Sequence, residues 1–276
     1  MRDAARAGHA RASMDLAAPA RAFVRGVPAS YARCLRREPV PVDPARARSQ
    51  VGEYARLLRA AGVAVEELPA DEACPDSCFI EDTAVILDAK TAFVTRPGAL
   101  SRRPEVAPVA LALGRVLWLV ALEGEGTLDG GDVLRLGDTL LVGLSERTDE
   151  AGAAALGGAA RRVGLEVVTV PVGEGLHLKS VVTLVAPGCV VAHESAPLDA
   201  LRRLGARVIE VDEPAGANVL ALGRVVLVST AAPGTRARLE REGVEVRAID
   251  VTELHKGDGA LTCLSLRVPA PGCWCA

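Results

Sequence analysis

The stretch Val133-Leu-Arg-Leu-Gly-Asp-Thr-Leu-Leu-Val142 consists of two short β-prone runs joined by a Gly-Asp turn, which is the pattern of a β-hairpin. Three further segments repeat this pattern, at residues 83–95, 181–192 and 219–228. The four hairpins start near residues 83, 133, 181 and 219, in steps of about 50, 48 and 38 residues. A fifth, partial unit would pair Leu261–Val268 near the C-terminus with Ala22–Val27 near the N-terminus.

Ala-, Arg- and Leu-rich stretches with helical spacing lie between the hairpins. The expected helices cover Arg46–Ala61, Pro104–Leu113, Glu150–Val163 and Pro233–Glu242. A hairpin and a helix that recur at this period predict repeated supersecondary units, arranged around an axis or along a solenoid.

Polar residues precede or open each hairpin. They are Glu81-Asp82, Gly131-Asp132, His177–Ser180, Ala217-Asn218 and Asp258. In a ring of such units the equivalent strand ends would converge on one mouth, so we expect these side chains to gather in a single cleft.

Composition indicates a globular protein. Hydrophobic residues make up 50% of the 276 residues, which excludes intrinsic disorder for most of the chain. The formal net charge of −3 gives no indication of a nucleic-acid or membrane surface. We expect one catalytic α/β domain over residues 21–270, a flexible tail at 1–20 and a C-terminal tail at 271–276. Seven irregularly spaced cysteines without a secretory signal indicate reduced thiols in a cytoplasmic protein.

Two acid-rich segments adjoin apolar strands, at Asp76–Asp82 and Glu123–Asp132. Carboxylates grouped near buried surface repel one another unless a cation offsets them, so a cationic ligand or a hard metal ion is expected there. Arginines follow the first two hairpins, at Arg96–Arg103 and in Ser145–Thr148. Because an arginine can hold a carboxylate through paired hydrogen bonds, acids and arginines together fit an amino-acid-like ligand.

Two residues can supply nucleophilic chemistry. His177 lies at the start of the third hairpin, and Cys263 lies between a Gly-containing loop and the last apolar run. A cysteine and a histidine that are distant in sequence can form a thiolate–imidazole pair if the fold joins them. The alternative for Cys263 is a small buried hydrophobic residue. Cys273 and Cys275 near the C-terminus are read as an incidental tail.

Six ordered motifs resemble the dimethylarginine dimethylaminohydrolase family of the guanidino-modifying (pentein) superfamily. They are Glu67-Leu-Pro-Ala-Asp-Glu-Ala-Cys-Pro-Asp-Ser-Cys-Phe-Ile-Glu-Asp-Thr-Ala-Val85, Thr95-Arg-Pro-Gly-Ala-Leu-Ser-Arg-Arg103, Gly126-Thr-Leu-Asp-Gly-Gly-Asp-Val133, Val142-Gly-Leu-Ser-Glu-Arg-Thr148, Gly175-Leu-His-Leu-Lys-Ser180 and Asp258-Gly-Ala-Leu-Thr-Cys263. The resemblance implies a five-bladed, pseudo-symmetric α/β propeller around a central channel. It also implies hydrolysis of dimethyl- or monomethyl-L-arginine to citrulline and the methylamine, without a cofactor or a metal.

The resemblance also implies roles for individual residues. Cys263 matches the nucleophile, His177 the general acid/base, and Asp129 the carboxylate that orients the imidazole. The matching substrate contacts are Asp76, Glu81 and Asp82 around the cationic groups, Arg102 and Arg147 at the α-carboxylate, Leu35 in the mobile lid, and Gly257 and Asp258 beside the nucleophile. Two positions depart from the family: a branched residue is frequent where Gly257 stands, and some members carry a second cysteine at Leu264.

Three alternatives stay open. An arginine deiminase or agmatine-type enzyme would use the same cysteine, histidine and acids, although the Arg102/Arg147 pair argues against agmatine, which has no carboxylate. A non-catalytic ring protein of the same fold would be expected to lack the Cys/His pair. A zinc hydrolase built on Cys263 and His177 would lose activity with chelators, whereas we expect zinc to inhibit. The expected partner is a small-molecule substrate, with no nucleic acid and no membrane, and the protein is a monomer or a homodimer.

Overall fold

The computed structural model describes residues 18–173 and 175–272, so most of the predicted tail at 1–20, together with Cys273 and Cys275, falls outside the described residues. The described chain forms five sheets of three strands each. From the inner to the outer strand, the five blades are β15 (Leu266–Val268), β1 (Arg21–Arg25) and β2 (Ala64–Leu68); β3 (Ala84–Ile86), β4 (Thr91–Val94) and β5 (Trp118–Ala121); β6 (Val133–Leu136), β7 (Thr139–Leu144) and β8 (Glu166–Pro171); β9 (Val182–Ala186), β10 (Cys189–His193) and β11 (Arg207–Val211); and β12 (Leu220–Leu222), β13 (Val225–Ser229) and β14 (Glu245–Ile249).

All five blades share one topology. The inner and middle strands pair antiparallel, as in the Val133↔Val142 register of β6 and β7. The middle and outer strands are parallel, as in the Thr139↔Glu166 register of β7 and β8. Because parallel neighbours require a crossover, a helix follows each middle strand. These helices are α1 (Pro44–Ala60), α2 (Val106–Leu113), α3 (Glu150–Arg161), α4 (Leu198–Arg203) and α5 (Pro233–Arg241).

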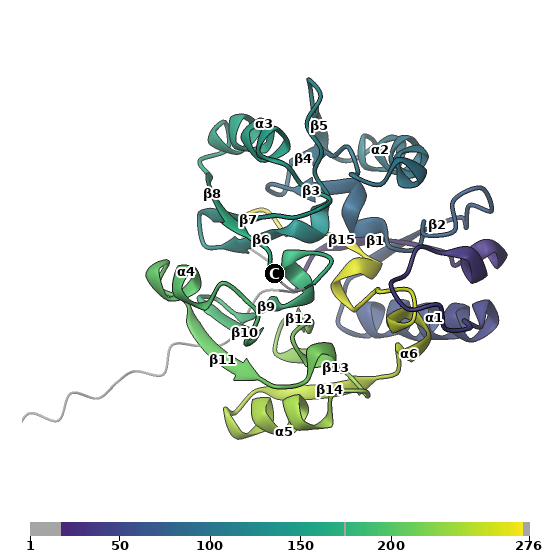
Figure 1. The fold of residues 1–276 in the computed structure, drawn as a ribbon, viewed down its shortest axis with the longest axis vertical. Helices are drawn as coiled ribbons and strands as arrows, with labels where there is room; N and C mark the ends of the chain where they lie inside the picture. The colour runs from purple at the N-terminus through teal and green to yellow at the C-terminus, as the bar shows by residue number, and fades with distance from the viewer. Residues whose placement is uncertain (1–17, 174, 273–276) are drawn as a thin grey trace, which may run out of the picture.

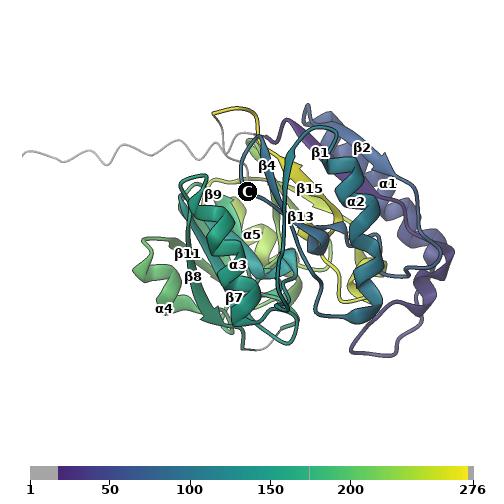
Figure 2. The same cartoon turned by 90° about the horizontal axis from the view of Figure 1, so that it is seen from above.

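The blades surround a central axis (Figure 1), so the predicted five-bladed α/β propeller is confirmed. Inner strands of adjacent blades contact one another, for example β9 with β12 and β15 with β3. The five helices lie on the outside, as both views show (Figure 2). The blade that contains β1 joins the two ends of the chain, because Arg21 of β1 pairs with Val268 of β15. This closure is the predicted partial fifth unit.

Burial follows the layers. The inner strand β9 is buried at every residue, whereas β5 on the outside has no buried residue. The four hydrophobic clusters lie between strands and the helices that cover them. Helix α3 begins after Asp149, whose side chain accepts a hydrogen bond from the N–H of Gly152 and caps the helix. A side chain at Gly152 would clash with the carbonyl of Thr127, so this helix packs closely against the chain.

A short 3₁₀ turn precedes every inner strand. The turns are η2 (Ile80–Thr83), η4 (Gly130–Asp132), η5 (Leu178–Ser180), η6 (Pro214–Gly216) and η7 (Thr262–Leu264). Turn η2 contacts both η4 and η7, and η4 contacts η5, so the turns meet at one end of the ring. The predicted convergence of the polar strand starts is therefore confirmed. Within the described residues, no helix has the length and apolarity needed to span a bilayer.

Candidate active site

A cavity opens at the end of the ring where the turns meet. Ten of the eleven predicted site residues line it: Leu35, Asp76, Asp82, Arg102, Asp129, Arg147, His177, Gly257, Asp258 and Cys263. Phe79, Leu176 and Gly259 complete the lining. We call this space the charged cavity. Glu81 is the predicted residue that the structure places outside it.

His177 lies directly before η5 and its side chain is buried. Its Nε2 atom is 3.0 Å from Oδ2 of Asp129 and 3.9 Å from Oδ1 of Asp82. Burial alone would lower the pKa of His177, but the nearby carboxylates raise it to about 9. The imidazole is therefore a cation at neutral pH and can act as a proton donor.

Asp82 is the buried anion of the charged cavity. It forms an ion pair with Nη1 of Arg102, and its Oδ1 accepts the N–H of Gly131 at 2.8 Å. Burial opposes ionisation, yet the charges of His177 and Arg102 outweigh it and lower the pKa of Asp82 to about 2. This carboxylate stays ionised and can face a second cation.

Arg102 makes most of its hydrogen bonds within the protein. Its Nε and Nη2 atoms bind the Glu105 carboxylate at 3.2 and 2.8 Å, and Nη2 also donates to the carbonyl of Phe79 at 2.8 Å. Since Nη1 donates to Asp82, one N–H of the five remains for a ligand. By contrast, within residues 18–173 and 175–272 the Arg147 guanidinium has no hydrogen bond or ion pair. Arg147 is therefore the better placed of the two to hold a carboxylate.

Cys263 lies in η7 and is partly exposed. Burial, with Glu81 and Asp82 nearby, raises the pKa of the thiol to about 12. The preceding Thr262 holds this turn in place, because its N–H donates to Asn218 at 3.0 Å and its hydroxyl donates to Glu81 at 2.8 Å. The turn that carries the partly exposed Cys263 thiol is thus held in place by hydrogen bonds.

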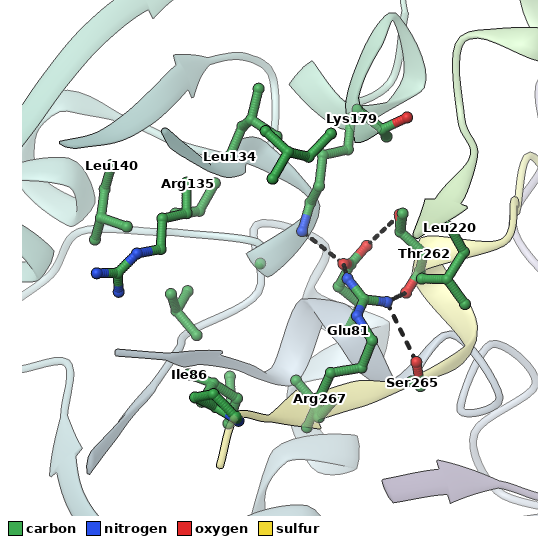
Figure 3. A pocket seen from close by; sticks show the side chains of 18 of the residues that line it. Glu81, Ile86, Leu134, Arg135, Leu140, Lys179, Leu220, Thr262, Ser265 and Arg267 are labelled. Atoms are coloured by element: carbon green, nitrogen blue, oxygen red, sulfur yellow. Dashed lines mark hydrogen bonds and ion pairs between the residues drawn. The ribbon is translucent and has the colours of Figure 1, made fainter. Parts of the chain in front are cut away.

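Glu81 lies in η2, outside the charged cavity. Its Oε1 accepts from Lys179 Nζ at 2.6 Å, and Arg267 Nη2 lies 3.6 Å from the same oxygen. Figure 3 shows Lys179, Thr262 and Arg267 converging on this carboxylate. Two positive charges therefore already offset Glu81, just as Arg102 and His177 face Asp82 in the charged cavity.

Comparison with known proteins matches this geometry to a family. A family model described as eukaryotic N,N dimethylarginine dimethylhydrolase matches residues 37–268. The dimethylarginine dimethylaminohydrolase of Streptomyces coelicolor is 44% identical over 230 residues, which cover 82% of this chain and 88% of that protein. The chain belongs to the dimethylarginine dimethylaminohydrolase family.

Two further relatives agree. The dimethylarginine dimethylaminohydrolase of Pseudomonas aeruginosa is 32% identical over 252 residues, which cover 90% of this chain and 96% of that protein. A solved structure from that organism, a cysteine-to-serine mutant complexed with citrulline, superposes with a TM-score of 0.86 at 29% identity and covers 91% of this chain and 99% of that one. The pentein fold and membership of this hydrolase family are therefore established for the chain.

The loop that carries Leu35 is tied to the dimethylarginine dimethylaminohydrolase site through two backbone groups. The N–H of Leu35 donates to Asp76 at 2.9 Å, and the N–H of Arg37 donates to Asp258 at 2.6 Å. Asp258 has a φ of 57°, an unusual conformation for a non-glycine residue. Its side chain therefore connects the loop before the nucleophile to the predicted lid.

Gly257 lies where a side chain would crowd its neighbours. A Cβ atom there would lie 2.5 Å from the Tyr31 hydroxyl and 3.0 Å from Cys34 Sγ. Both neighbours belong to the segment that leads into Leu35. A branched side chain would therefore displace that segment.

The carboxylates and the histidine also bear on metal binding. Asp82, Asp129 and His177 offer ligand atoms within 4.8 Å of one another. However, Arg102 and the Gly131 N–H already bind Asp82, and His177 is protonated at neutral pH. A metal ion would have to displace a proton and face an arginine, so the cluster suits an organic cation better than a metal.

Four further residues hold the site. Asp132, Lys179 and Asn218 were among the polar residues expected in the cleft but were given no individual role, and Glu105 was not singled out. Asp132 binds the N–H of Leu178 at 2.9 Å and the hydroxyls of Ser145 and Thr148, each at 2.7 Å. The spacing of Arg102 and Glu105 by three residues is a signal that would have suggested their pairing.

Proposed function

We propose that the protein hydrolyses asymmetric dimethyl-L-arginine and monomethyl-L-arginine to L-citrulline and the corresponding methylamine. The observation that carries the proposal is the composition of the charged cavity, where Cys263 and His177 share one space with buried carboxylates and with Arg147. The solved relative complexed with citrulline supports the product.

Binding of the substrate follows from the charges. The α-carboxylate pairs with Arg147 and the remaining N–H of Arg102, and the α-amino group lies near Asp76. The guanidinium faces Asp82, whose pKa of about 2 keeps it ionised. Hydrogen bonds to charged groups contribute about 1.5–3 kcal/mol each, so a few of them hold the reactive carbon in place.

The substrate itself activates the nucleophile. With a pKa of about 12, Cys263 is a thiol in the free protein at neutral pH. The thiol gives its proton to solvent, because the bound guanidinium adds a positive charge beside the sulfur and favours the thiolate. The thiolate attacks the central carbon, and the tetrahedral adduct collapses when His177 protonates the departing amine.

Water completes the turnover. The covalent thiouronium on Cys263 is attacked by a water molecule, from which neutral His177 takes a proton. The hydroxyl proton that remains passes to the sulfur as the C–S bond breaks, citrulline leaves, and the thiol and the protonated imidazole are restored. Asp129 keeps the imidazole oriented through both steps, as a carboxylate does for a general acid/base histidine.

A direct assay tests the proposal. Citrulline release is measured from dimethylarginine, monomethylarginine, arginine and agmatine in parallel, with Cys263→Ser as the control. We expect turnover of the methylated substrates and none by the variant. Preference for unmethylated arginine would favour the arginine deiminase-like alternative, and full activity of Cys263→Ser would overturn the assignment of the nucleophile.

Several broader properties remain part of the proposal. Residues 21–270 are proposed as one catalytic domain, because the strands of the first blade come from both ends of that range. Cys34, Cys74, Cys78, Cys189 and Cys263 are free thiols, which suits a reducing cytoplasm. The proposed ligand is a small molecule, bound by a monomer or a homodimer.

A further inference from the structure

A second cavity, of about 220 Å³, adjoins the charged cavity, whose own volume is only about 30 Å³. The two cavities share four lining residues, His177, Asp258, Gly259 and Cys263. Cys263 and His177 therefore line both cavities. The second cavity lacks Asp76, Asp82, Arg102 and Arg147. Its wall includes Ser180, Pro214, Ala215, Asn218 and Ala260. We call it the side cavity.

His177 lines both cavities. Its Nε2 atom is 3.0 Å from Asp129 and 3.9 Å from Asp82, which line the charged cavity and not the side cavity. Gly131, which lines the side cavity, packs against the ring, because a Cβ atom there would lie 2.8 Å from Nδ1 and 2.9 Å from Cγ. Since Asp129 holds Nε2, Nδ1 is the ring nitrogen left to exchange a proton with the reacting groups.

The side cavity continues towards the rim of the ring. A third cavity, of about 270 Å³, shares Ser180, Pro214 and Asp258 with it and reaches the exposed Arg37 and the partly exposed His193. A route therefore runs from Nδ1 of His177 to the outside, past Pro214 and Ala215, without crossing the residues that hold the amino-acid part of the substrate.

We propose that the side cavity receives the methylated amine when the C–N bond breaks and admits the water that replaces it. This inference rests on the proposed function. The Nδ1 proton of His177 passes to the leaving nitrogen, the C–N bond breaks with its electron pair on that nitrogen, and the amine moves into the side cavity. Water then enters by the same route, gives its proton back to Nδ1 and attacks the carbon bound to Cys263.

The consequence is selectivity by the size of the leaving group. The charged cavity is the smaller of the two and holds the covalent intermediate, whereas the side cavity, which Glu81 and Lys179 also line, offers the methyl groups the apolar carbons of Pro214, Ala215 and Ala260. Ala215, which is partly exposed on η6, is then a residue that determines specificity. Filling the space beside it should slow departure of a large amine more than of a small one.

The test uses Ala215→Leu, Ala215→Val and, as the matched control, Ala107→Leu on the exposed face of α2. We expect Ala215→Leu to lower kcat about tenfold for dimethylarginine and two- to threefold for monomethylarginine, with KM nearly unchanged and Ala215→Val in between. The control should match the wild type. A second readout is incorporation of labelled dimethylamine into unreacted dimethylarginine, which the leucine variant should also reduce.

Different failures separate the two proposals. Equal slowing of both substrates, or no slowing at all in folded Ala215→Leu and Ala215→Val, would overturn the side-cavity inference while leaving the function intact. A wild-type protein that releases no citrulline from either methylated arginine would overturn the function and the inference together.

Discussion

His177 and His255 are two histidines of similar position and opposite character. Both side chains line the side cavity, and the ring of each forms a hydrogen bond. The pKa of His177 is raised to about 9, because carboxylates outweigh its burial. The pKa of His255 is lowered by burial, which the carbonyl of Gly259 and the more distant Asp250 offset only in part.

The partners of His255 also fix its tautomer. Nδ1 lies 3.0 Å from the carbonyl oxygen of Gly259, which only accepts, so Nδ1 carries the proton. Nε2, 2.8 Å from Ser229 Oγ, then accepts from that hydroxyl. The comparison teaches that the charge of the partner, more than burial, decides whether a histidine here exchanges protons or holds a loop.

Replacing His177 should have the largest effect. Loss of a general acid/base lowers turnover by about 10²–10⁴-fold. We expect His177→Ala to have no measurable turnover of dimethylarginine while circular dichroism shows an intact fold. His193→Ala is the control, since His193 forms a similar hydrogen bond with Ser195 but lies on the rim. Substantial activity in His177→Ala would end the assignment of His177 as the proton donor.

Asp129→Asn should give the His177 ring a neutral hydrogen-bond partner, as the His255 ring has. The amide still accepts a hydrogen bond from Nε2, but its missing charge lowers the pKa of the imidazole below about 9. The alkaline limb of kcat/KM, which we expect near pH 9 for the wild type, should therefore move to lower pH. We expect roughly a ten- to hundredfold loss at pH 8 and a smaller one at pH 6. A uniform loss at every pH would contradict an electrostatic role for Asp129.

The sequence predicted the repeats and the site better than the periphery. The hairpins and four of the five outer helices were expected because buried strands and amphipathic helices have clear patterns. The outer strands were not, since β5 has no buried residue and β14 has one in a run of five. Helix α4 spans only six residues, too few to show a period.

At the site, residue types were predictable but their partners were not. The acids and arginines in the sequence predicted a charged pocket. Only the fold shows that Arg102 is held by Glu105 and that Glu81 pairs with Lys179. Glu81 and Lys179 are 98 positions apart in the chain, and a pattern of neighbouring residues carries no information on such a contact. The same holds for the bond between His255 and Ser229.

His255 variants should sharpen the comparison with a smaller effect on catalysis. We expect His255→Leu, which loses the bond to the Gly259 carbonyl, to lower kcat/KM for dimethylarginine about fivefold through the loop that contains Gly257 and Asp258. His255→Asn, which can donate to the same carbonyl, should recover much of this loss. Because His255 exchanges no proton with the substrate, the pH profile should keep its shape in both variants. A shifted alkaline limb would show that His255 takes part in proton transfer.

The smallest expected effect is on stability, and its sign differs between the two histidines. His177 has a folded pKa above the unfolded value of about 6.5, so its contribution to the free energy of unfolding is complete below pH 6.5 and is lost as the pH rises through about 9. His255 has a lowered pKa, so its contribution is present above about pH 6.5 and is lost as the pH falls through the folded value. Urea unfolding measured across the range from pH 5 to about pH 9 follows both contributions.

In that experiment His255→Gln removes the titration, and we expect its free energy of unfolding to change less than that of the wild type on acidification. His177→Gln serves as the opposite case, since it should flatten the loss of stability between pH 6.5 and 9 instead. If both substitutions reduced the pH dependence of stability over the same pH range, the hydrogen-bond partners would not determine the charge of the two rings. Burial alone would then have to explain both pKa values. His177 has a charged partner in Asp129, whereas His255 has the neutral partners Ser229 and Gly259. We therefore expect the two substitutions to change the pH dependence of stability over different pH ranges.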